Sequence, residues 1–231
     1  QKMFSSFRKD LRAVMERDPA VKSKLEVVLC YPGFHAVQMH KLAHALYRRG
    51  WFVLARLLSQ LSRFITGIEI HPGASIGDGL FIDHGSGVVI GETTVVGNNV
   101  TIYQGVTLGG TGKEKGKRHP TIGNNVVISA GAKILGSFNV GDNCKIGAGS
   151  VVLKTVPPDS TVVGVPGKVV ARNGRKIPTE GTNEMDIDLR HDLLPDPVAE
   201  MLQYLQVKIE RLDKRTRELE KQNMRLLNLS S

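Results

Sequence analysis

An aliphatic residue recurs at every sixth position through the middle of this chain, and a glycine often follows it directly. A hexapeptide period of this kind indicates a parallel β-helix, in which short strands stack coil upon coil and the repeated aliphatic side chains fill the core. The phase holds from Ile70 to Val152 with two interruptions, so chance does not explain it. The repeated positions are Ile70, Ile76 and Ile82, then Ile90, Val96, Ile102 and Leu108, then Ile122, Ile128, Ile134, Val140, Ile146 and Val152.

Each interruption of the repeat predicts a loop on one face of the solenoid. The spacing between Ile82 and Ile90 is two residues too long, and the spacing between Leu108 and Ile122 is eight residues too long. Loops on a rigid scaffold commonly carry binding and catalytic residues. The functional site is therefore expected at these two places.

The composition narrows the classes of partner. A formal net charge of +9 favours an anionic partner, such as nucleic acid, a membrane surface or a phosphorylated cofactor. The sequence shows no RNA-binding aromatic motif and no recognition-helix pattern, so no nucleic acid is expected. The most apolar stretch, residues 51–65, is interrupted by Arg56 and Arg63, so no membrane is expected. The two cysteines, Cys30 and Cys144, suggest no disulfide framework, which fits a cytoplasmic protein.

The pattern divides the chain into four segments. Residues 3–66 are expected to be helical, with a stop at Asp18-Pro19 and helices at about 34–48 and 51–66. Residues 67–170 form the β-helix, and the polar residues 171–196 are interpreted as a linker. A heptad pattern over 197–229 predicts a coiled coil. Its a and d positions hold Leu202, Leu205, Ile209, Leu212, Thr216, Leu219, Asn223 and Leu226.

The first interruption contains Asp83-His84-Gly85, beside Gly91-Glu92. An imidazole at such a boundary is placed as a general base that takes a proton from an alcohol or amine near neutral pH. Glu69 stands about one coil earlier, where a carboxylate can hold the imidazole in its basic tautomer. The alternative is that His84 only forms hydrogen bonds within a turn.

The second interruption is a glycine-rich, basic loop that ends in Arg118-His119-Pro120. Arg118 is suited to pair with a substrate carboxylate through two parallel hydrogen bonds. The alternative is a solvated charged loop. It is not a phosphate-binding Walker loop, because Lys113 is not followed by Ser or Thr. His40 and His44 share a helix face, but their pattern favours packing, and no metal is expected.

These motifs resemble the serine O-acetyltransferase family. The resemblance covers residues 5–170 and rests on a helical Arg17-Asp18-Pro19-Ala20, on Glu69–Ala74, on Asp83–Thr93 and on the loop that ends in Arg118-His119-Pro120. It implies a left-handed parallel β-helix with acetyl-CoA as co-substrate, bound between neighbouring subunits of a homotrimer. The activity implied is acetyl transfer to the hydroxyl of L-serine, the first step of cysteine biosynthesis, with L-cysteine as feedback inhibitor.

The resemblance also assigns roles to residues. It implies His84 as the base and Glu69 as its carboxylate partner. The amino acid would lie among Asp18, Asp83, Arg118 and His119. The coenzyme A arm would lie along Gly110, Thr111, Ala130, Lys145, Ala148 and Lys168.

Two features bear on assembly. The helical region is shorter than in members that form dimers of trimers, which favours a single trimer over a hexamer. The chain ends in Leu229-Ser230-Ser231 rather than in the isoleucine that members insert into cysteine synthase, so that complex is not expected.

Three other functions stay open at this point. The same solenoid serves acetyltransferases that act on a sugar or antibiotic hydroxyl, but Asp18 and Arg118 suit an amino acid better. A non-catalytic trimeric scaffold would have no use for His84 beside Glu69. A zinc hydratase would need three converging histidines, which the spacing does not suggest.

Overall fold

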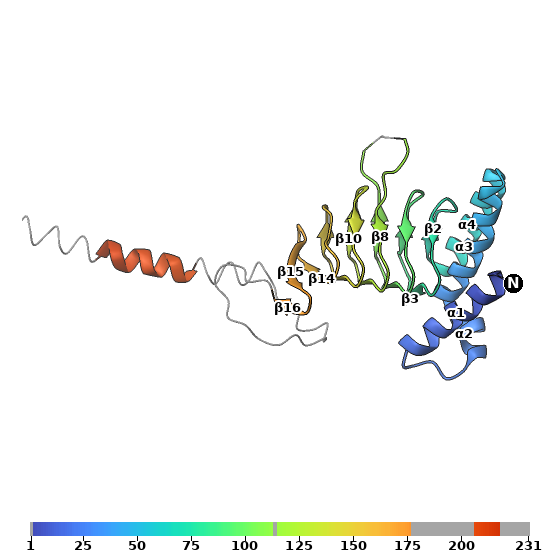
Figure 1. Cartoon of the computed structure of the whole chain (residues 1–231), viewed down its shortest axis with the longest axis horizontal. Helices are drawn as coiled ribbons and strands as arrows, with labels where there is room; N and C mark the ends of the chain where they lie inside the picture. The colour runs from blue at the N-terminus through green and yellow to red at the C-terminus, as the bar shows by residue number, and fades with distance from the viewer. Residues whose placement is uncertain (1, 113–114, 177–205, 218–231) are drawn as a thin grey trace, which may run out of the picture.

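The computed structural model describes residues 2–112, 115–176 and 206–217, and it places a group of helices at one end of a β-helix (Figure 1). The helices are α1 (Lys2–Arg17), α2 (Lys24–Cys30), α3 (Pro32–Arg48) and α4 (Phe52–Thr66). Helix α1 ends where Asp18-Pro19 predicts, because a proline disfavours helical backbone in the residue before it. The Ser23 hydroxyl caps α2 by accepting the Glu26 N–H at 3.1 Å, and Gly67 ends α4 in the left-handed conformation.

The β-helix confirms the hexapeptide prediction. Its strands belong to three sheets of stacked short strands: the first sheet has the order β1-β4-β7-β10-β13, the second β11-β8-β5-β2, and the third β16-β15-β14-β12-β9-β6-β3. The strands are β1 (Glu69–Ile70), β2 (Ser75–Ile76), β3 (Phe81–Ile82), β4 (Val89–Ile90), β5 (Val95–Val96), β6 (Thr101–Ile102), β7 (Thr107–Gly109), β8 (Thr121–Ile122), β9 (Val127–Ile128), β10 (Lys133–Leu135), β11 (Asn139–Val140), β12 (Lys145–Ile146), β13 (Val151–Val152), β14 (Ser160–Val163), β15 (Lys168–Arg172) and β16 (Arg175–Lys176).

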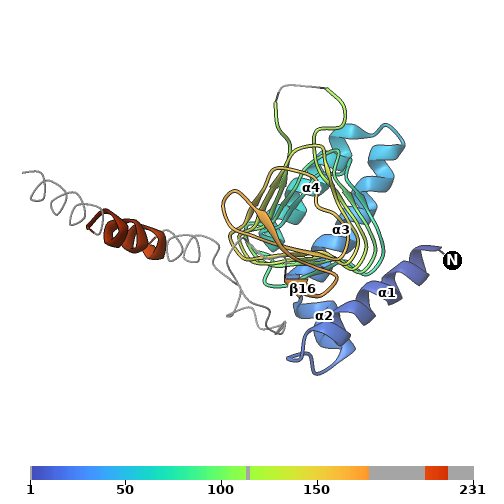
Figure 2. The ribbon, with the colours of Figure 1, turned by 60° about the vertical axis from the view of Figure 1, so that its left-hand side comes forward.

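The repeated aliphatic residues align coil upon coil and form the core. Ile70 pairs with Ile90, and Ile90 pairs with Leu108, along the first sheet. Seen obliquely along its axis, the chain traces superimposed triangles whose sides are the three sheets (Figure 2). The inward side chains of Ile90, Leu108 and Ile134 are fully buried, as is Cys144. Cys144 is thus a small core residue, as its repeat position predicts.

The corner between the second and third sheets is stabilised by a ladder of amide side chains. Asn99, Asn125 and Asn143 each adopt a positive φ, which asparagine tolerates better than most residues. Their side chains are hydrogen-bonded in sequence, with Asn99 donating to Asn125 at 3.4 Å and Asn125 donating to Asn143 at 3.1 Å. The ladder ends at Asp159, which accepts from Asn143 at 2.8 Å.

The far end of the solenoid differs from the expected boundary. The linker was expected from residue 171, but β15 runs to Arg172 and pairs antiparallel with β16. Asn173 and Gly174 both have positive φ and form the two-residue turn between these strands. An Asn-Gly pair of this kind is a hairpin signal, which the polar composition of the segment obscured. Strand structure therefore continues through Lys176.

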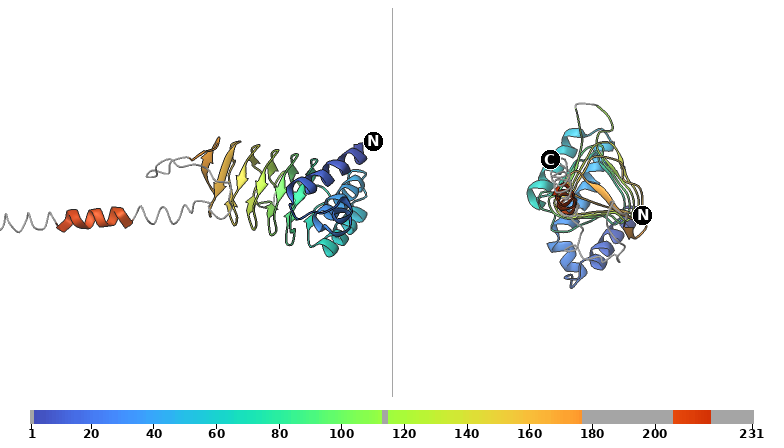
Figure 3. Two further views of the ribbon diagram at one scale, coloured as in Figure 1. Left: turned by 90° about the horizontal axis from the view of Figure 1, so that it is seen from below. Right: turned by 90° about the vertical axis from the view of Figure 1, so that its left-hand side faces the viewer.

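A buried ionic group attaches the helices to the first coil. The Asp10 carboxylate is 1% exposed, forms an ion pair with Lys41 and accepts hydrogen bonds from Gln38 at 2.8 Å and from the Gly79 N–H at 3.0 Å. The Arg17 guanidinium donates to the carbonyls of Gly79 and Val100, both at 3.2 Å. Figure 3 shows the helices gathered across this end of the solenoid.

In the C-terminal segment, residues 206–217 are helical and exposed. Of the heptad positions, Ile209, Leu212 and Thr216 lie in this helix, and the other positions of the predicted coiled coil lie outside the described residues. Within the part of the chain that the structure describes, none of the helices has the length and apolar character needed to cross a membrane.

Candidate active site

His84 lies on a tight turn between β3 and β4, at the corner that joins the third sheet to the first. Its φ is 54°, a conformation that is uncommon for a residue with a Cβ atom. The Gly85 N–H donates to the Asp83 carbonyl at 2.7 Å, which closes the turn. The His84 side chain is 76% exposed, and its Nε2 lies 3.7 Å from an Asp83 carboxylate oxygen. Backbone strain at an exposed histidine is typical of a functional position.

Asp18 is held beside this turn by a tyrosine. The Tyr31 hydroxyl donates to Asp18 Oδ2 at 2.7 Å, and the Ala20 N–H donates to Asp18 Oδ1 at 2.8 Å. Burial, the hydrogen bond to Asp18 and the charge of Asp83 raise the pKa of Tyr31 to about 12. Burial, followed by Asp83 and Asp18, likewise raises the pKa of Tyr103. Asp18 and Asp83, the residue that precedes His84, thus act on the same two tyrosines, and this pair of carboxylates would suit an ammonium group.

Glu69, on β1, does not bond to His84 among the described residues. Its Oε2 lies 3.3 Å from a guanidinium nitrogen of Arg63 on α4. The two residues belong to neighbouring coils, because the Glu69 N–H donates to the Val88 carbonyl at 2.9 Å, at the end of the His84 turn. The expected histidine–carboxylate pair therefore remains a prediction.

A column of small residues extends from the His84 turn along the same corner. The backbone N–H groups of Gly105, Gly131 and Gly149 donate to the carbonyls of the preceding coils, which belong to Ser86, Gln104 and Ala130. Ala148 therefore lies one coil beyond Ala130. No side chain on the three glycines covers the backbone here, so a long ligand can lie close to it. Lys145 and Lys168, on strands of the adjoining third sheet, are exposed.

His119 is buried at a different corner, where the loop of residues 110–120 joins the first sheet to the second. The loop projects from the solenoid in Figure 1. His119 Nδ1 lies 3.2 Å from the Thr93 N–H and 2.9 Å from the Thr93 hydroxyl. That hydroxyl accepts the backbone N–H groups of Arg118 at 3.0 Å and His119 at 3.1 Å. Thr93 therefore fixes the returning end of the loop.

Two glycines make room for the His119 ring. A Cβ atom on Gly91 would lie 2.0 Å from a ring carbon of His119, and one on Gly110 would lie 3.2 Å from Nε2. Gly110 and the neighbouring Thr111 are exposed. Burial, followed by the charge of Arg118, lowers the pKa of His119. The ring is consequently neutral near pH 7, with Nδ1 as an acceptor and the proton on Nε2.

Arg118 forms an ion pair with Glu92, at 2.5 Å between Nη2 and Oε2. The hydrogen bond from Arg118, followed by one from Tyr47, lowers the pKa of Glu92 despite burial. The Tyr47 hydroxyl donates to the other oxygen of Glu92 at 3.0 Å. Arg118 thus has a fixed orientation where the exposed part of the loop returns to the buried His119.

The six candidate residues for catalysis and amino-acid binding do not form a single cluster in one chain. Asp83 and His84 lie at one corner, and Asp18 acts with Asp83 on the same two tyrosines, whereas Arg118 and His119 lie at another corner. Within the described parts of the chain, no hydrogen bond or ion pair joins the two clusters. The same residues contain no group of three or more His, Cys, Asp or Glu side chains arranged to hold a metal ion.

Comparison with known proteins identifies the family. A family model described as the N-terminal part of serine acetyltransferase matches residues 1–39, and the bacterial transferase hexapeptide (six repeats) matches residues 119–154. The serine acetyltransferase of Bacillus subtilis is 57% identical over 219 residues, which cover 93% of this chain and 97% of the relative. The chain belongs to the serine acetyltransferase family.

Solved serine acetyltransferases share the fold. The Neisseria gonorrhoeae enzyme in complex with serine is 49% identical, with a TM-score of 0.71 over 74% of this chain and 69% of that one. The Brucella abortus enzyme in complex with coenzyme A is 51% identical, with a TM-score of 0.73 over 75% of this chain and 69% of that one. A serine acetyltransferase in complex with cysteine is 45% identical, with a TM-score of 0.73 over 74% of this chain and 67% of that one.

Sequence reasoning missed four residues that hold the candidate site residues in place: Tyr31, Tyr47, Glu92 and Thr93. Glu92 and Thr93 directly follow Gly91 at a repeat boundary, which is a signal that could have found them. Tyr31 and Tyr47 lie at the two ends of α3 and bond to residues that are distant in the sequence. A sequence periodicity does not reveal such tertiary contacts.

Proposed function

We propose that this protein transfers the acetyl group of acetyl-CoA to the hydroxyl of L-serine and releases O-acetyl-L-serine and coenzyme A. Membership of the serine acetyltransferase family over nearly the whole chain carries the proposal. The exposed, strained turn at His84 supports it, because it leaves an imidazole free to act as a general base.

His84 accepts the proton of the serine hydroxyl as the oxygen attacks the thioester carbonyl. The carbon–sulfur bond then breaks, and the thiolate of coenzyme A takes the proton from the His84 imidazolium, which restores the base. Glu69 supports the imidazolium in the transition state, after exchanging its contact with Arg63 for one with His84. Asp18 and Asp83 bind the ammonium group of serine. Arg118 and His119 bind its carboxylate, His119 through its Nε2–H.

The coenzyme A arm lies along the column that descends from the His84 turn, past Ala130 and Ala148. The open glycine backbone of this column fits a long, flexible ligand. The exposed ammonium groups of Lys145 and Lys168 complement its phosphates. Gly110 and Thr111, on the loop at the other corner, would reach its acetyl end from a neighbouring chain.

We further infer a homotrimer with a left-handed solenoid, in which each active site combines two chains. One protomer supplies Asp18, Asp83 and His84, and a neighbour supplies Arg118 and His119, because the two clusters lie at different corners of one chain. Helix α4 supports this arrangement, since it exposes an apolar face that a monomer would leave in water. That face holds Val53, Leu57, Leu61, Phe64 and Ile65.

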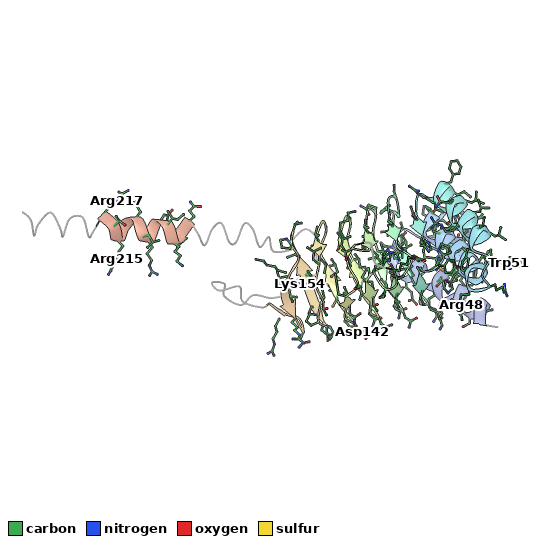
Figure 4. All side chains as sticks on the ribbon, turned by 90° about the horizontal axis from the view of Figure 1, so that it is seen from above. Arg48, Trp51, Asp142, Lys154, Arg215 and Arg217 are labelled. Atoms are coloured by element: carbon green, nitrogen blue, oxygen red, sulfur yellow. The ribbon has the colours of Figure 1, made fainter. Side chains whose placement is uncertain are left out.

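The helices and the far end of the solenoid lie at opposite ends of the protomer. Figure 4 shows Trp51 at the helical end and Lys154 toward the other. The three tails of a trimer would leave from this second end, and residues 197–229 would form a coiled coil on the threefold axis. A chain that ends at Lys176 should remain a trimer in sedimentation but melt at a lower temperature.

The test of function measures thiol release from acetyl-CoA with serine, homoserine, threonine and galactosides as acceptors. Serine should give the highest kcat/KM. Faster turnover with a galactoside would instead favour the alternative, an acetyltransferase for a sugar or antibiotic hydroxyl. We also expect L-cysteine to bind, because it carries the same ammonium and carboxylate groups as serine. Mixed-chain trimers, in which one subunit type carries His84→Ala and the other Arg118→Ala, should regain some activity if sites are shared.

A further inference from the structure

Among the described residues, the carboxylate of Glu92 links helix α3 to the loop of residues 110–120. Near the C-terminal end of this helix, the Tyr47 hydroxyl donates to Glu92 Oε1 at 3.0 Å. Glu92 Oε2 accepts from Arg118 Nη2 at 2.5 Å. Glu92 therefore receives one hydrogen bond on each oxygen, from a helix on one side and from the loop on the other.

Two ring contacts hold the Tyr47 side chain in place. Its ring packs edge-on against Phe52, with 4.9 Å between centroids, and against His71, with 5.8 Å between centroids. Burial and the contact with Glu92 raise the pKa of Tyr47, so that the hydroxyl keeps its proton and acts as a donor. The carboxylate of Glu92 is thus fixed by a rigid aromatic group rather than by solvent.

The contact with Glu92 uses one end of the guanidinium group. The hydrogen bond to Glu92 engages one N–H of Arg118 Nη2. The other N–H of Nη2, together with an N–H of the neighbouring Nε or Nη1, forms a second edge that can bind another planar acceptor. A substrate carboxylate binds two parallel N–H groups only if the plane of the guanidinium has the right orientation. Thr93 fixes the backbone of Arg118, but among the described residues only Glu92 holds its guanidinium group through a hydrogen bond that the structure shows.

We propose that Tyr47 and Glu92 are positioning residues that orient Arg118 and so make the enzyme selective for acceptors with a carboxylate group. This inference rests on the proposed function, in which Arg118 binds the carboxylate of serine. Neither residue touches the substrate. Both act through the guanidinium group of Arg118.

The test compares L-serine with L-serinamide, which keeps the ammonium group and the hydroxyl but lacks the carboxylate. Tyr47→Phe removes one hydroxyl and keeps the ring. It should raise the KM for serine by about threefold to tenfold, the usual worth of one hydrogen bond, with little change in kcat. The kcat/KM for serinamide should stay the same, because no carboxylate is left to orient. Glu92→Gln should act in the same direction and more strongly, since it also removes the charge beside Arg118.

Tyr31→Phe is the matched control. It also removes a tyrosine hydroxyl from a carboxylate, but that carboxylate belongs to Asp18, which binds the ammonium group. Its effect should therefore appear with serine and serinamide alike. A structural defect caused by losing a tyrosine hydroxyl would also affect both substrates, so selectivity for serine distinguishes positioning from damage.

A double-mutant cycle completes the test. In an Arg118→Ala background, Tyr47→Phe should have no further effect on the KM for serine. Additive effects would overturn the positioning role. If Arg118→Ala lowers the preference for serine over serinamide but Tyr47→Phe does not, the positioning role of Tyr47 is refuted while the carboxylate-binding role of Arg118 stands. If Arg118→Ala leaves the preference unchanged, the carboxylate-binding role of Arg118 fails, and the inference fails with it.

Discussion

Replacing Gly91 with alanine should displace His119 and weaken serine use by a predictable amount. A Cβ atom at this position would lie 2.0 Å from Cδ2 and 2.1 Å from Nε2 of the His119 ring. Carbon atoms in contact prefer a separation of about 3.5–4.0 Å, so the ring has to move by more than about 1 Å. The φ of Gly91 is not positive, so alanine adds no backbone strain and the substitution tests the steric contact alone.

Movement of the ring breaks identifiable contacts. His119 Nδ1 would leave the Thr93 N–H, now at 3.2 Å, and the Thr93 hydroxyl, now at 2.9 Å. Each such hydrogen bond contributes about 0.5–1.5 kcal/mol to the native state. The larger effect is on the substrate, because a group misplaced by about 1 Å can lower the rate by roughly 100-fold. We therefore expect Gly91→Ala to lower kcat/KM for serine by about two orders of magnitude.

Steady-state kinetics on four proteins test whether the loss of kcat/KM acts through His119. These are the parent chain, Gly91→Ala, His119→Ala and the double variant. If the defect of Gly91→Ala acts through His119, the double variant should be no worse than His119→Ala alone, because the smaller side chain removes the clash. A double variant that loses a further 100-fold would refute the reasoning and place the clash elsewhere.

Four other outcomes are expected. His84→Ala should lower turnover by roughly 10²–10⁴-fold and Glu69→Gln by less, as measured by thiol release, since a positioned base acts in the transition state; near-normal turnover of His84→Ala would refute its role as the base. Asp10→Ala should cost about 3–5 kcal/mol in urea unfolding, because it leaves the partly buried ammonium of Lys41 without its anion and the buried Gly79 N–H without an acceptor. Burial, followed by the charge of His44, lowers the pKa of His40 to about 3, so the unfolded chain binds a proton that the folded chain excludes; stability should fall as the pH drops from about 6.5 toward 3, by up to about 1.4 kcal/mol per pH unit, and His40→Gln should flatten this slope. L-Cysteine should compete with serine in kinetics and in calorimetry, and the absence of binding at millimolar cysteine would contradict the shared ammonium and carboxylate contacts.

The solenoid was predictable because its core depends on a local period. Ile90, Leu108 and Ile134 are buried one above another, and the six-residue spacing alone placed them there. The two interruptions of the period correctly located the turn of His84 and the loop that carries Arg118. The Asn173-Gly174 turn was available to the same reasoning, but the polar residues around it favoured a linker.

The contacts between the helices and the solenoid could not be predicted in the same way. Asp10 accepts from Gly79 and Tyr47 donates to Glu92, and both pairs are far apart in the sequence. Such contacts depend on how the helices dock, which no local period records. The division of the candidate residues between two corners was equally hidden, because the repeat shows which residues face outward but not which of them a neighbouring chain completes.

Helix α3 connects the two halves of the proposed substrate site. Tyr31 precedes its first residue and donates to Asp18, on the ammonium side, whereas Tyr47 lies near its last residue and donates to Glu92, on the carboxylate side. A helix of 17 residues is stiff, so it fixes the separation of these two hydroxyl groups. If each site combines two chains, the two ends of one α3 serve different sites. The ammonium half of one site is then mechanically joined to the carboxylate half of the next, and Asp10 and Arg17, which attach the helices to the first coil, set the geometry of both.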